Sequence, residues 1–152
     1  QDTMKRPDYL NKIKKIIVGL EKDDIILRIL RGFYEYPEYN DFVGEYISPA
    51  PDKIAHAPAR NYGWTTIPCG DAALNIMGFF AQVPSAWPYV SDGIYKEYNY
   101  GNVKIKFKHT TNKEISNLSY KIALPIQAIK ALGKENIDSK TVNRIARVIT
   151  LT

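Results

Sequence analysis

Six lysine and arginine side chains near the N-terminus have the chemistry to bind phosphate groups. Four belong to a predicted helix and two to the hairpin predicted to follow it: Lys12, Lys14, Lys15, Lys22, Arg28 and Arg31. If the helix enters the major groove of a duplex, its lysines reach phosphates or guanine edges, and the arginines reach the neighbouring backbone or the minor groove. The alternative is that these cations only solvate a helix face, and the sequence leaves both interpretations open.

A second set of cations alternates with apolar residues further along the chain. Residues 103–109 carry Lys104, Lys106 and Lys108 in a strict period of two, which predicts a strand with the three lysines on one face. Such a stripe suits contact with an acidic partner or with nucleic acid. Lysines also protect edge strands against pairing with other chains. We favour the second interpretation and therefore expect this strand at the edge of its sheet.

Residues suited to catalysis or metal binding are sparse. Cys69 is the only cysteine, and His56 and His109 are the only histidines. A cysteine–histidine dyad needs a thiolate beside a base, but Cys69 begins a predicted helix in an apolar context, where a buried structural cysteine is commoner. The sequence shows neither a cluster of three metal ligands nor a glycine-rich phosphate loop. We therefore expect no enzyme activity, no cofactor and no metal.

Composition and charge place the chain among ordinary globular proteins. It has 152 residues, 45% of them hydrophobic, and a net charge of +5. Residues 1–31 hold eight basic and five acidic residues, residues 32–101 three and eight, and residues 102–152 ten and three, so two basic ends flank an acidic middle. The single cysteine, with no membrane-spanning run or signal peptide, predicts a cytoplasmic protein that has no membrane partner.

The N-terminal elements resemble the second half of a winged helix. Apolar spacing predicts a helix over residues 8–22. Residues 25–36 predict a β-hairpin that turns at Arg31-Gly32. Residues 37–51, with three prolines, predict a linker or crossover. Tyrosines gather here, at Tyr34, Tyr36, Tyr39 and Tyr46, and would suit either a protein interface or packing between two lobes.

The remaining residues predict a mixed domain of helices and strands. Helices are expected near residues 54–62, 70–80, 118–132 and 138–151, a short strand at 64–67, an extended segment at 83–90 and a hairpin over 94–109. The fold class is thus α/β (α+β). We divide the chain into a partial winged-helix lobe, residues 1–45, and a mixed α/β domain, residues 46–152.

Several stretches, in order, resemble one family. Leu30 to Pro37 is similar to a wing in which an Arg-Gly-aromatic run ends in proline, and Pro68 to Gly78 to a helix ending in a Leu/Met-Gly pair. The resemblance continues along the chain through Gln82-Val83-Pro84, Tyr89 to Gly93, and the basic strand ending in His109-Thr110-Thr111. Together they resemble the AbiEi-like antitoxins of type IV toxin–antitoxin (abortive infection) systems, over most of the chain from Ile25 to Gly133.

The resemblance implies a bacterial transcriptional regulator with an antitoxin-like C-terminal domain. Such a protein binds operator DNA through a winged helix, represses its own operon and counters a nucleotidyltransferase toxin, directly or indirectly; a homodimer is compatible with this. A complete winged helix-turn-helix has two helices before its recognition helix, and only seven residues precede Asp8. We therefore expect either that the chain is a fragment or that Met4 is the true start and the DNA-binding unit is incomplete. Two alternatives are a protein–protein interaction module without autonomous DNA binding and an enzyme that acts through Cys69.

Overall fold

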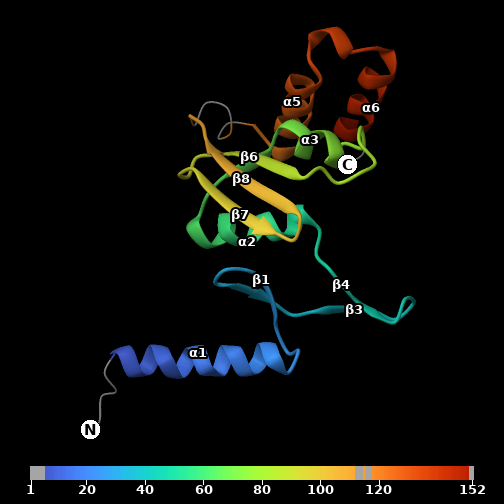
Figure 1. Cartoon of the computed structure of the whole chain (residues 1–152). Helices are drawn as coiled ribbons and strands as arrows, with labels where there is room; N and C mark the ends of the chain where they lie inside the picture. The colour runs from blue at the N-terminus through green and yellow to red at the C-terminus, as the bar shows by residue number, and fades with distance from the viewer. Residues whose placement is uncertain (1–5, 112–114, 116–117, 151–152) are drawn as a thin grey trace. The chain divides into compact units, whose positions relative to one another are not determined.

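The computed structural model describes residues 6–111, 115 and 118–150 and divides into two compact units (Figure 1). Unit 1 comprises Gln1–Ala50 and unit 2 comprises Pro51–Thr152. Helices and small sheets are mixed along the chain, so the fold is α+β, as the sequence predicts. Within the described part of the chain, no helix combines the length and apolarity needed to cross a membrane.

Unit 1 begins with the predicted helix and hairpin. Helix α1 spans Arg6–Lys22 and ends where the Asp23 amide bonds to the Gly19 carbonyl. Strands β1 (Leu27–Leu30) and β2 (Phe33–Glu35) pair antiparallel. Their tight turn contains Gly32 at φ +83°, a left-handed conformation that glycine adopts without strain. The structure therefore confirms a helix followed at once by a two-stranded hairpin.

A second hairpin replaces the predicted linker. Strands β3 (Glu38–Asn40) and β4 (Glu45–Ile47) pair antiparallel, so the prediction of a linker over residues 37–51 is wrong. The prolines mislead because Pro37 lies before β3 and Pro49 after β4, where neither removes a hydrogen bond of the ladder. The side chain of Asn40 supplies the turn by accepting the Phe42 amide at 2.9 Å.

Unit 2 is built on a four-stranded sheet. Its strands are β5 (Thr66–Pro68), β6 (Ala86–Ser91), β7 (Lys96–Tyr100) and β8 (Val103–His109), in the order β5-β6-β8-β7. The β6–β8 pair is parallel and the other pairs are antiparallel.

Strand β8 therefore lies inside the sheet, and the prediction that it is an edge strand is wrong. The physical reason is Phe107, which is fully buried. Its ring stacks on Tyr89 of β6 and meets Tyr98 of β7 edge to face, so burying it requires a neighbouring strand on each side.

Helices cover both faces of this sheet (Figure 1). Helix α2 (Pro51–Tyr62) lies on one face, and α3 (Gly70–Ile76) and α5 (Tyr120–Leu132) lie on the other. The short 3-10 turn η1 (Lys134–Asn136) leads from α5 to α6 (Ser139–Thr150), which packs beside α5. Buried residues of α2 recur every three or four positions, which turns one side of the helix toward the sheet.

On the α3–α5 side, the described residues of unit 2 form a core with two parts. One joins three helices and consists of Ala73, Leu74, Met77, Leu124, Ala128 and Ile145. The other lies against the sheet and consists of Ile67, Ile115 and Ala123. The sequence predicts Val142, Ile145, Ala146 and Ile149 on the inner side of α6. Ile145 is buried as predicted, but Val142 and Ile149 are 54% and 42% exposed and Ala146 is exposed as well. Thr141 is buried in addition to Ile145.

Helix α3 ends earlier than predicted. The sequence predicts a helix to Phe80, whereas α3 stops at Ile76. Gly78 takes φ +81°, and the Phe79 amide bonds back to the Leu74 carbonyl at 2.8 Å. A glycine in this conformation closes a helix, and the two phenylalanines that continue the apolar pattern lie beyond that stop.

Candidate functional site

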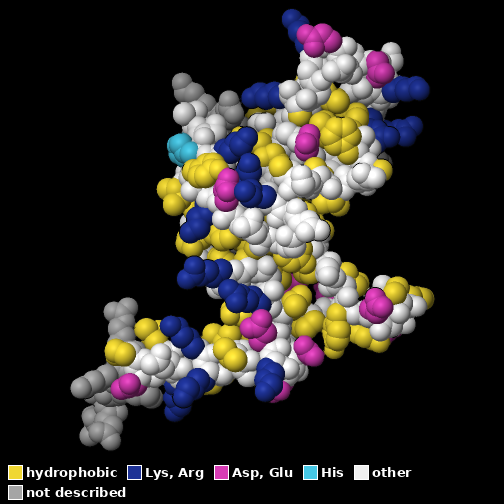
Figure 2. Space-filling view, in the orientation of Figure 1, with side chains coloured by type: hydrophobic (Ala, Val, Ile, Leu, Met, Phe, Trp, Pro, Cys, Tyr) yellow, Lys and Arg dark blue, Asp and Glu magenta, His cyan; other side chains and the backbone are white. Residues whose placement is uncertain are grey.

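The four lysines predicted to meet a polyanion are all exposed on α1. Lys15 and Lys22 are seven residues apart and so share one face of the helix, opposite Ile13 and Leu20. Lys12 and Lys14 lie on either flank of the apolar face. Figure 2 shows dark blue side chains along this helix. The four lysines thus lie off the apolar stripe of Ile13, Ile17 and Leu20, and their face also carries the exposed Val18.

The two predicted arginines are exposed on the hairpin that follows α1. Arg28 lies in β1 opposite Tyr34, and Arg31 lies in the turn beside Gly32. Among the residues that the structure describes, none of the six N-terminal cations forms an ion pair. Unit 1 therefore brings all six together within a helix and the hairpin behind it, with their charges available to a ligand.

The lysine stripe of β8 lies on the face of the sheet opposite Phe107. Lys104 and Lys106 lie 3.8 Å and 4.0 Å from carboxylate oxygens of Glu97 on the neighbouring strand β7. In Figure 2 several dark blue side chains gather in this region with an acidic one among them. Within the described part of the chain, Lys108 has no such partner. The stripe is thus partly neutralised by its own sheet.

Glu97 is held in place by a tyrosine. The hydroxyl of Tyr95, two residues earlier on the same face, donates a hydrogen bond to the Glu97 carboxylate. That hydrogen bond, together with Lys104 and Lys106, lowers the pKa of Glu97 below its ordinary value. The carboxylate therefore stays charged, and it would compete with any acidic partner for two of the three lysines.

A third basic surface lies on α6 and is not among the predicted sites. Lys140, Asn143, Arg144 and Arg147 project from one face and, with Val148, line a hollow of 440 Å³. Arg144 is fixed because its guanidinium donates to the Gly78 carbonyl and lies 5.4 Å from the centre of the Phe79 ring. The spacing of three and four residues could have revealed this face, since α6 contains no acidic residue.

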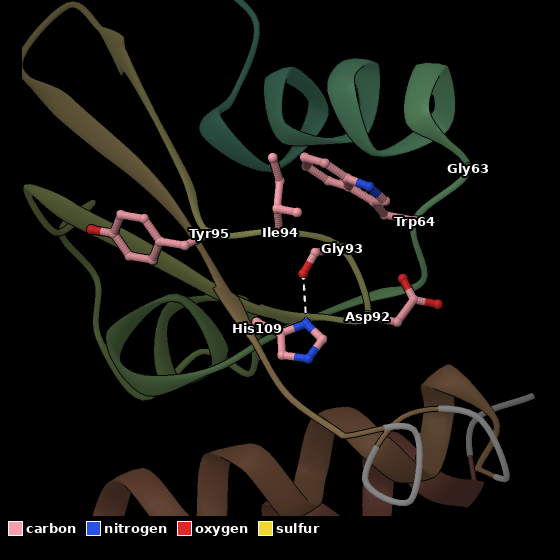
Figure 3. Close-up of a pocket in the computed structure, with 7 residues that line it drawn as sticks. All are labelled: Gly63, Trp64, Asp92, Gly93, Ile94, Tyr95 and His109. Carbon is pink, nitrogen blue, oxygen red and sulfur yellow. Dashed lines mark hydrogen bonds between the residues drawn. The ribbon is translucent and has the colours of Figure 1, made fainter.

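A pocket of 580 Å³ lies where the β6–β7 connection passes the end of α2 (Figure 3). Its wall includes Trp64, Asp92, Ile94 and His109. His109 Nδ1 lies 2.7 Å from the Gly93 carbonyl oxygen. A carbonyl can only accept, so Nδ1 carries the proton, and Nε2 is an acceptor whenever the ring is neutral.

The tryptophan of this pocket is largely occupied by protein. Tyr62 stacks on the indole with ring centres 4.8 Å apart. Gly93 packs so closely that a Cβ there would lie 2.3 Å from the indole. Because Asp92 accepts the Thr65 amide at 2.8 Å, one of its two oxygens is also used within the protein. The pocket thus offers hydrogen-bond acceptors rather than a stacking surface or an anion site.

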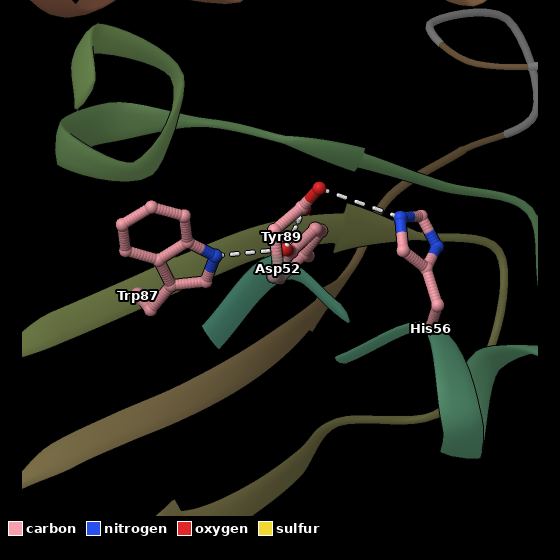
Figure 4. Close-up of polar contacts among 4 residues, drawn as sticks. All are labelled: Asp52, His56, Trp87 and Tyr89. Atoms are coloured by element: carbon pink, nitrogen blue, oxygen red, sulfur yellow. Dashed lines mark hydrogen bonds and ion pairs between the residues drawn. The ribbon is translucent and has the colours of Figure 1, made fainter. Parts of the chain in front are cut away.

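A chain of polar contacts joins α2 to β6 beneath the sheet (Figure 4). Trp87 Nε1 donates to the Tyr89 hydroxyl at 2.7 Å, and that hydroxyl donates to Asp52. His56, one turn along α2, lies 3.5 Å from the other Asp52 oxygen. Trp87 and Tyr89 are buried.

The protonation states in this chain follow from its contacts. Burial acts to raise the pKa of Asp52, but the hydrogen bonds from His56 and Tyr89 outweigh it and hold the pKa below its ordinary value. The Asp52 carboxylate in turn raises the pKa of His56. The network is a charge-stabilised anchor for the first turn of α2.

Cys69 occupies a buried position at the start of α3. Burial raises the pKa of its thiol above the ordinary value, which disfavours the nucleophilic thiolate. Among the described residues, no group of three histidine, cysteine or acidic side chains is placed to hold a metal ion.

The surfaces of the described residues differ in their charge and hydrogen-bonding chemistry. Cations dominate α1 with its hairpin, β8 and α6, whereas the pocket beside His109 presents acceptors. A comparison with protein-family models matches residues 7–151 to a family described as a family of unknown function, DUF6088. No curated protein and no solved structure matches the chain.

Proposed function

The chain belongs to the DUF6088 family, which is described as a family of unknown function. We propose that the protein is a DNA-binding antitoxin. It represses its own operon and counters a nucleotidyltransferase toxin, as its resemblance to AbiEi-like regulators implies. DNA binding is the activity of unit 1, and toxin neutralisation is the activity of unit 2.

One observation carries the DNA-binding half of the proposal. Six cations on one helix and the hairpin behind it are exposed and form no ion pair within the described part of the chain. A duplex supplies closely spaced phosphates that such cations neutralise with release of counterions. A helix followed by a basic hairpin also has the dimensions to enter a major groove and touch the adjacent backbone.

Fluorescence anisotropy with a labelled duplex from the promoter of the protein's own operon tests this. We expect affinity to fall steeply with salt. Replacing Lys15 and Lys22 with Gln should flatten the slope of log affinity against log salt by about 0.9 for each phosphate that the protein no longer neutralises. Arg31→Gln should act in the same direction.

The matched control is Lys134→Gln together with Lys130→Gln, which removes the same charge from unit 2. It should leave the salt slope unchanged. Absence of binding to the promoter duplex at low salt would refute the DNA-binding half. An equal effect in the control would show that net charge, and not unit 1, attracts the DNA.

The antitoxin half is supported by the resemblance of Pro68 to Gly78 and of the strand that ends at His109-Thr111. Co-expression of the full chain with the toxin gene of the same operon measures toxin neutralisation as recovery of growth. The triple variant Lys104→Gln, Lys106→Gln and Lys108→Gln tests the stripe as a contact surface. Unchanged recovery would assign these lysines to the sheet alone.

The second candidate is an interaction module that does not bind DNA. It is favoured by the apolar side of α1, where Tyr9 is 55%, Leu10 48% and Ile16 56% exposed. Exposed apolar side chains in this number typically mark a surface that another protein covers. Neutralisation of the toxin by a chain that does not bind the promoter would favour this candidate.

A further inference from the structure

The β3–β4 hairpin ends in an exposed apolar tip. Phe42 is fully exposed and Val43 is 67% exposed. In Figure 2 this hairpin shows hydrophobic and acidic side chains and no dark blue on the face in view. An exposed phenyl ring at the end of an arm is costly in water and is typical of a side chain that another surface receives.

Hydrogen bonds close the turn at the tip. The Asn40 side chain accepts the amides of Phe42 and Val43, and the Gly44 amide bonds to the Asn40 carbonyl at 2.8 Å. Behind the turn, Tyr39 and Tyr46 meet edge to face with ring centres 5.2 Å apart. These contacts define the backbone of the turn from which Phe42 projects, so less backbone entropy is lost when the tip docks.

The charge around the tip defines its partner. Residues 32–51 contain four acidic residues and no basic one, and two of the acids, Asp41 and Glu45, flank Phe42. Like charges oppose contact with nucleic acid or with the same hairpin of another molecule. The tip requires a basic surface that has an apolar floor.

Unit 2 carries such a surface. The hollow of 440 Å³ on α6 is lined by Lys140, Arg144 and Arg147, with Val148 as its apolar member. Within the described residues, Lys140 and Arg147 form no ion pair. The lysines of β8 are less suited, because Glu97 already neutralises two of them.

We propose that the β3–β4 hairpin of one molecule docks in the α6 hollow of a second copy of this chain. Phe42 fills the hollow over Val148, while Asp41 and Glu45 meet Lys140 and Arg147. Each copy carries both the arm and its receptor, so the contact is one that identical chains can make with each other. This inference does not depend on the proposed function.

Sedimentation velocity of the full chain over a range of protein concentrations tests the contact. We expect concentration-dependent association that weakens at high ionic strength. Phe42→Ser should weaken the association constant by about thirtyfold, as truncation of a central aromatic residue does. The charge-reversed arm, Asp41→Lys with Glu45→Lys, and the charge-reversed receptor, Lys140→Glu with Arg147→Glu, should each abolish association.

Mixing the two charge-reversed variants should restore association, since opposite charges again face each other. Restoration also shows that both variants are folded. The control Asp23→Lys with Glu135→Lys makes the same charge change outside the arm and should associate as the unaltered chain does. A chain that stays monomeric at every concentration, or a mixture that does not associate, would overturn the proposal.

Discussion

The side chain of Tyr89 is buried, and its hydroxyl connects three residues through two hydrogen bonds. It accepts from Trp87 and donates to Asp52, and its own pKa is raised by burial and by the Asp52 charge. Removing the hydroxyl leaves a buried indole N–H and part of a carboxylate without their partner. Such losses cost more than the hydrogen bond itself contributes.

We predict that Tyr89→Phe lowers the free energy of unfolding by about 2 kcal/mol. Tyr120→Phe makes the same chemical change at a residue that is 44% exposed, and it should have little effect. Urea denaturation of both variants measures the difference. Equal effects would mean that the network adds nothing to stability.

His56 should make stability depend on pH. Its pKa is raised from 6.5, so its contribution is fully present below that pH and is lost as the pH rises through the folded value. The pKa of Asp52 is lowered from 3.8, so its contribution is present above that pH and is lost as the pH falls through the folded value. The pair therefore stabilises most between its two folded pKa values.

His56→Gln should remove the loss of stability that occurs as the pH rises through the folded pKa of His56. Because the imidazole is 55% exposed, the effect is only about 0.5 kcal/mol. Urea midpoints at about pH 5.5 and about pH 8.5 bracket the ordinary histidine pKa and give the comparison. The prediction fails if the variant keeps the same difference between the two midpoints as the unaltered chain.

Gly93 is required for packing, because a Cβ at this position would lie 2.3 Å from the indole of Trp64. We predict that Gly93→Ala destabilises the protein by about 2 kcal/mol through overpacking. Gly19→Ala is a control of opposite sign. It has open space in the interior of α1 and should stabilise by about 0.5 kcal/mol or more. Thermal melting of the two variants separates a steric cause from a general effect of alanine.

Helix α6 depends on a side chain just before its first residue. Asp138 accepts the Thr141 amide and the Thr141 hydroxyl, both at 2.8 Å, and the amide bond is the first cause of its lowered pKa. Asp138→Ala should lower the melting temperature and the helical circular dichroism signal, whereas Ser139→Ala should not. The difference should vanish as the pH falls through the folded pKa of Asp138, since the protonated acid caps poorly.

Local patterns predicted most helices and both halves of the β7–β8 hairpin. Apolar spacing located α1, and the helix predicted over residues 118–132 ends where α5 does. The prolines around β3 and β4 led to the incorrect prediction of a linker, because composition does not show where a proline lies relative to the hydrogen bonds of a ladder. The interior position of β8 could not be predicted either, because a strand with alternating residues has the same sequence pattern whether it bonds to one neighbouring strand or to two.

The candidate sites likewise include some that the sequence predicts and some that only the structure reveals. The exposed cations of α1 and its hairpin were visible in the sequence because each is close to the next along the chain. The Trp87–Tyr89–Asp52–His56 network was not, since Asp52 and Tyr89 are 37 residues apart and meet only through the fold. Long-range contacts of this kind depend on topology, which periodicity does not encode.

The two units should differ in local stability. Unit 1 contains two separate two-stranded ladders, whereas β6 and β8 of unit 2 lie inside a four-stranded sheet with helices on both faces. Two-stranded ladders are marginal by themselves. We predict that amides of β1 to β4 exchange with deuterium much faster than those of β6 and β8. Hydrogen-exchange mass spectrometry of the full chain measures this, and equal protection would contradict it.

The place of β8 has a consequence for synthesis. It is the last strand of the sheet to leave the ribosome, yet it must insert between β6 and β7. Until it emerges, β7 has no strand to bond, and Trp64, Tyr89 and Tyr98 lack the ring of Phe107. A nascent chain halted before Val103 therefore displays unfinished apolar surface to proteases and chaperones, and only the arrival of seven more residues hides it.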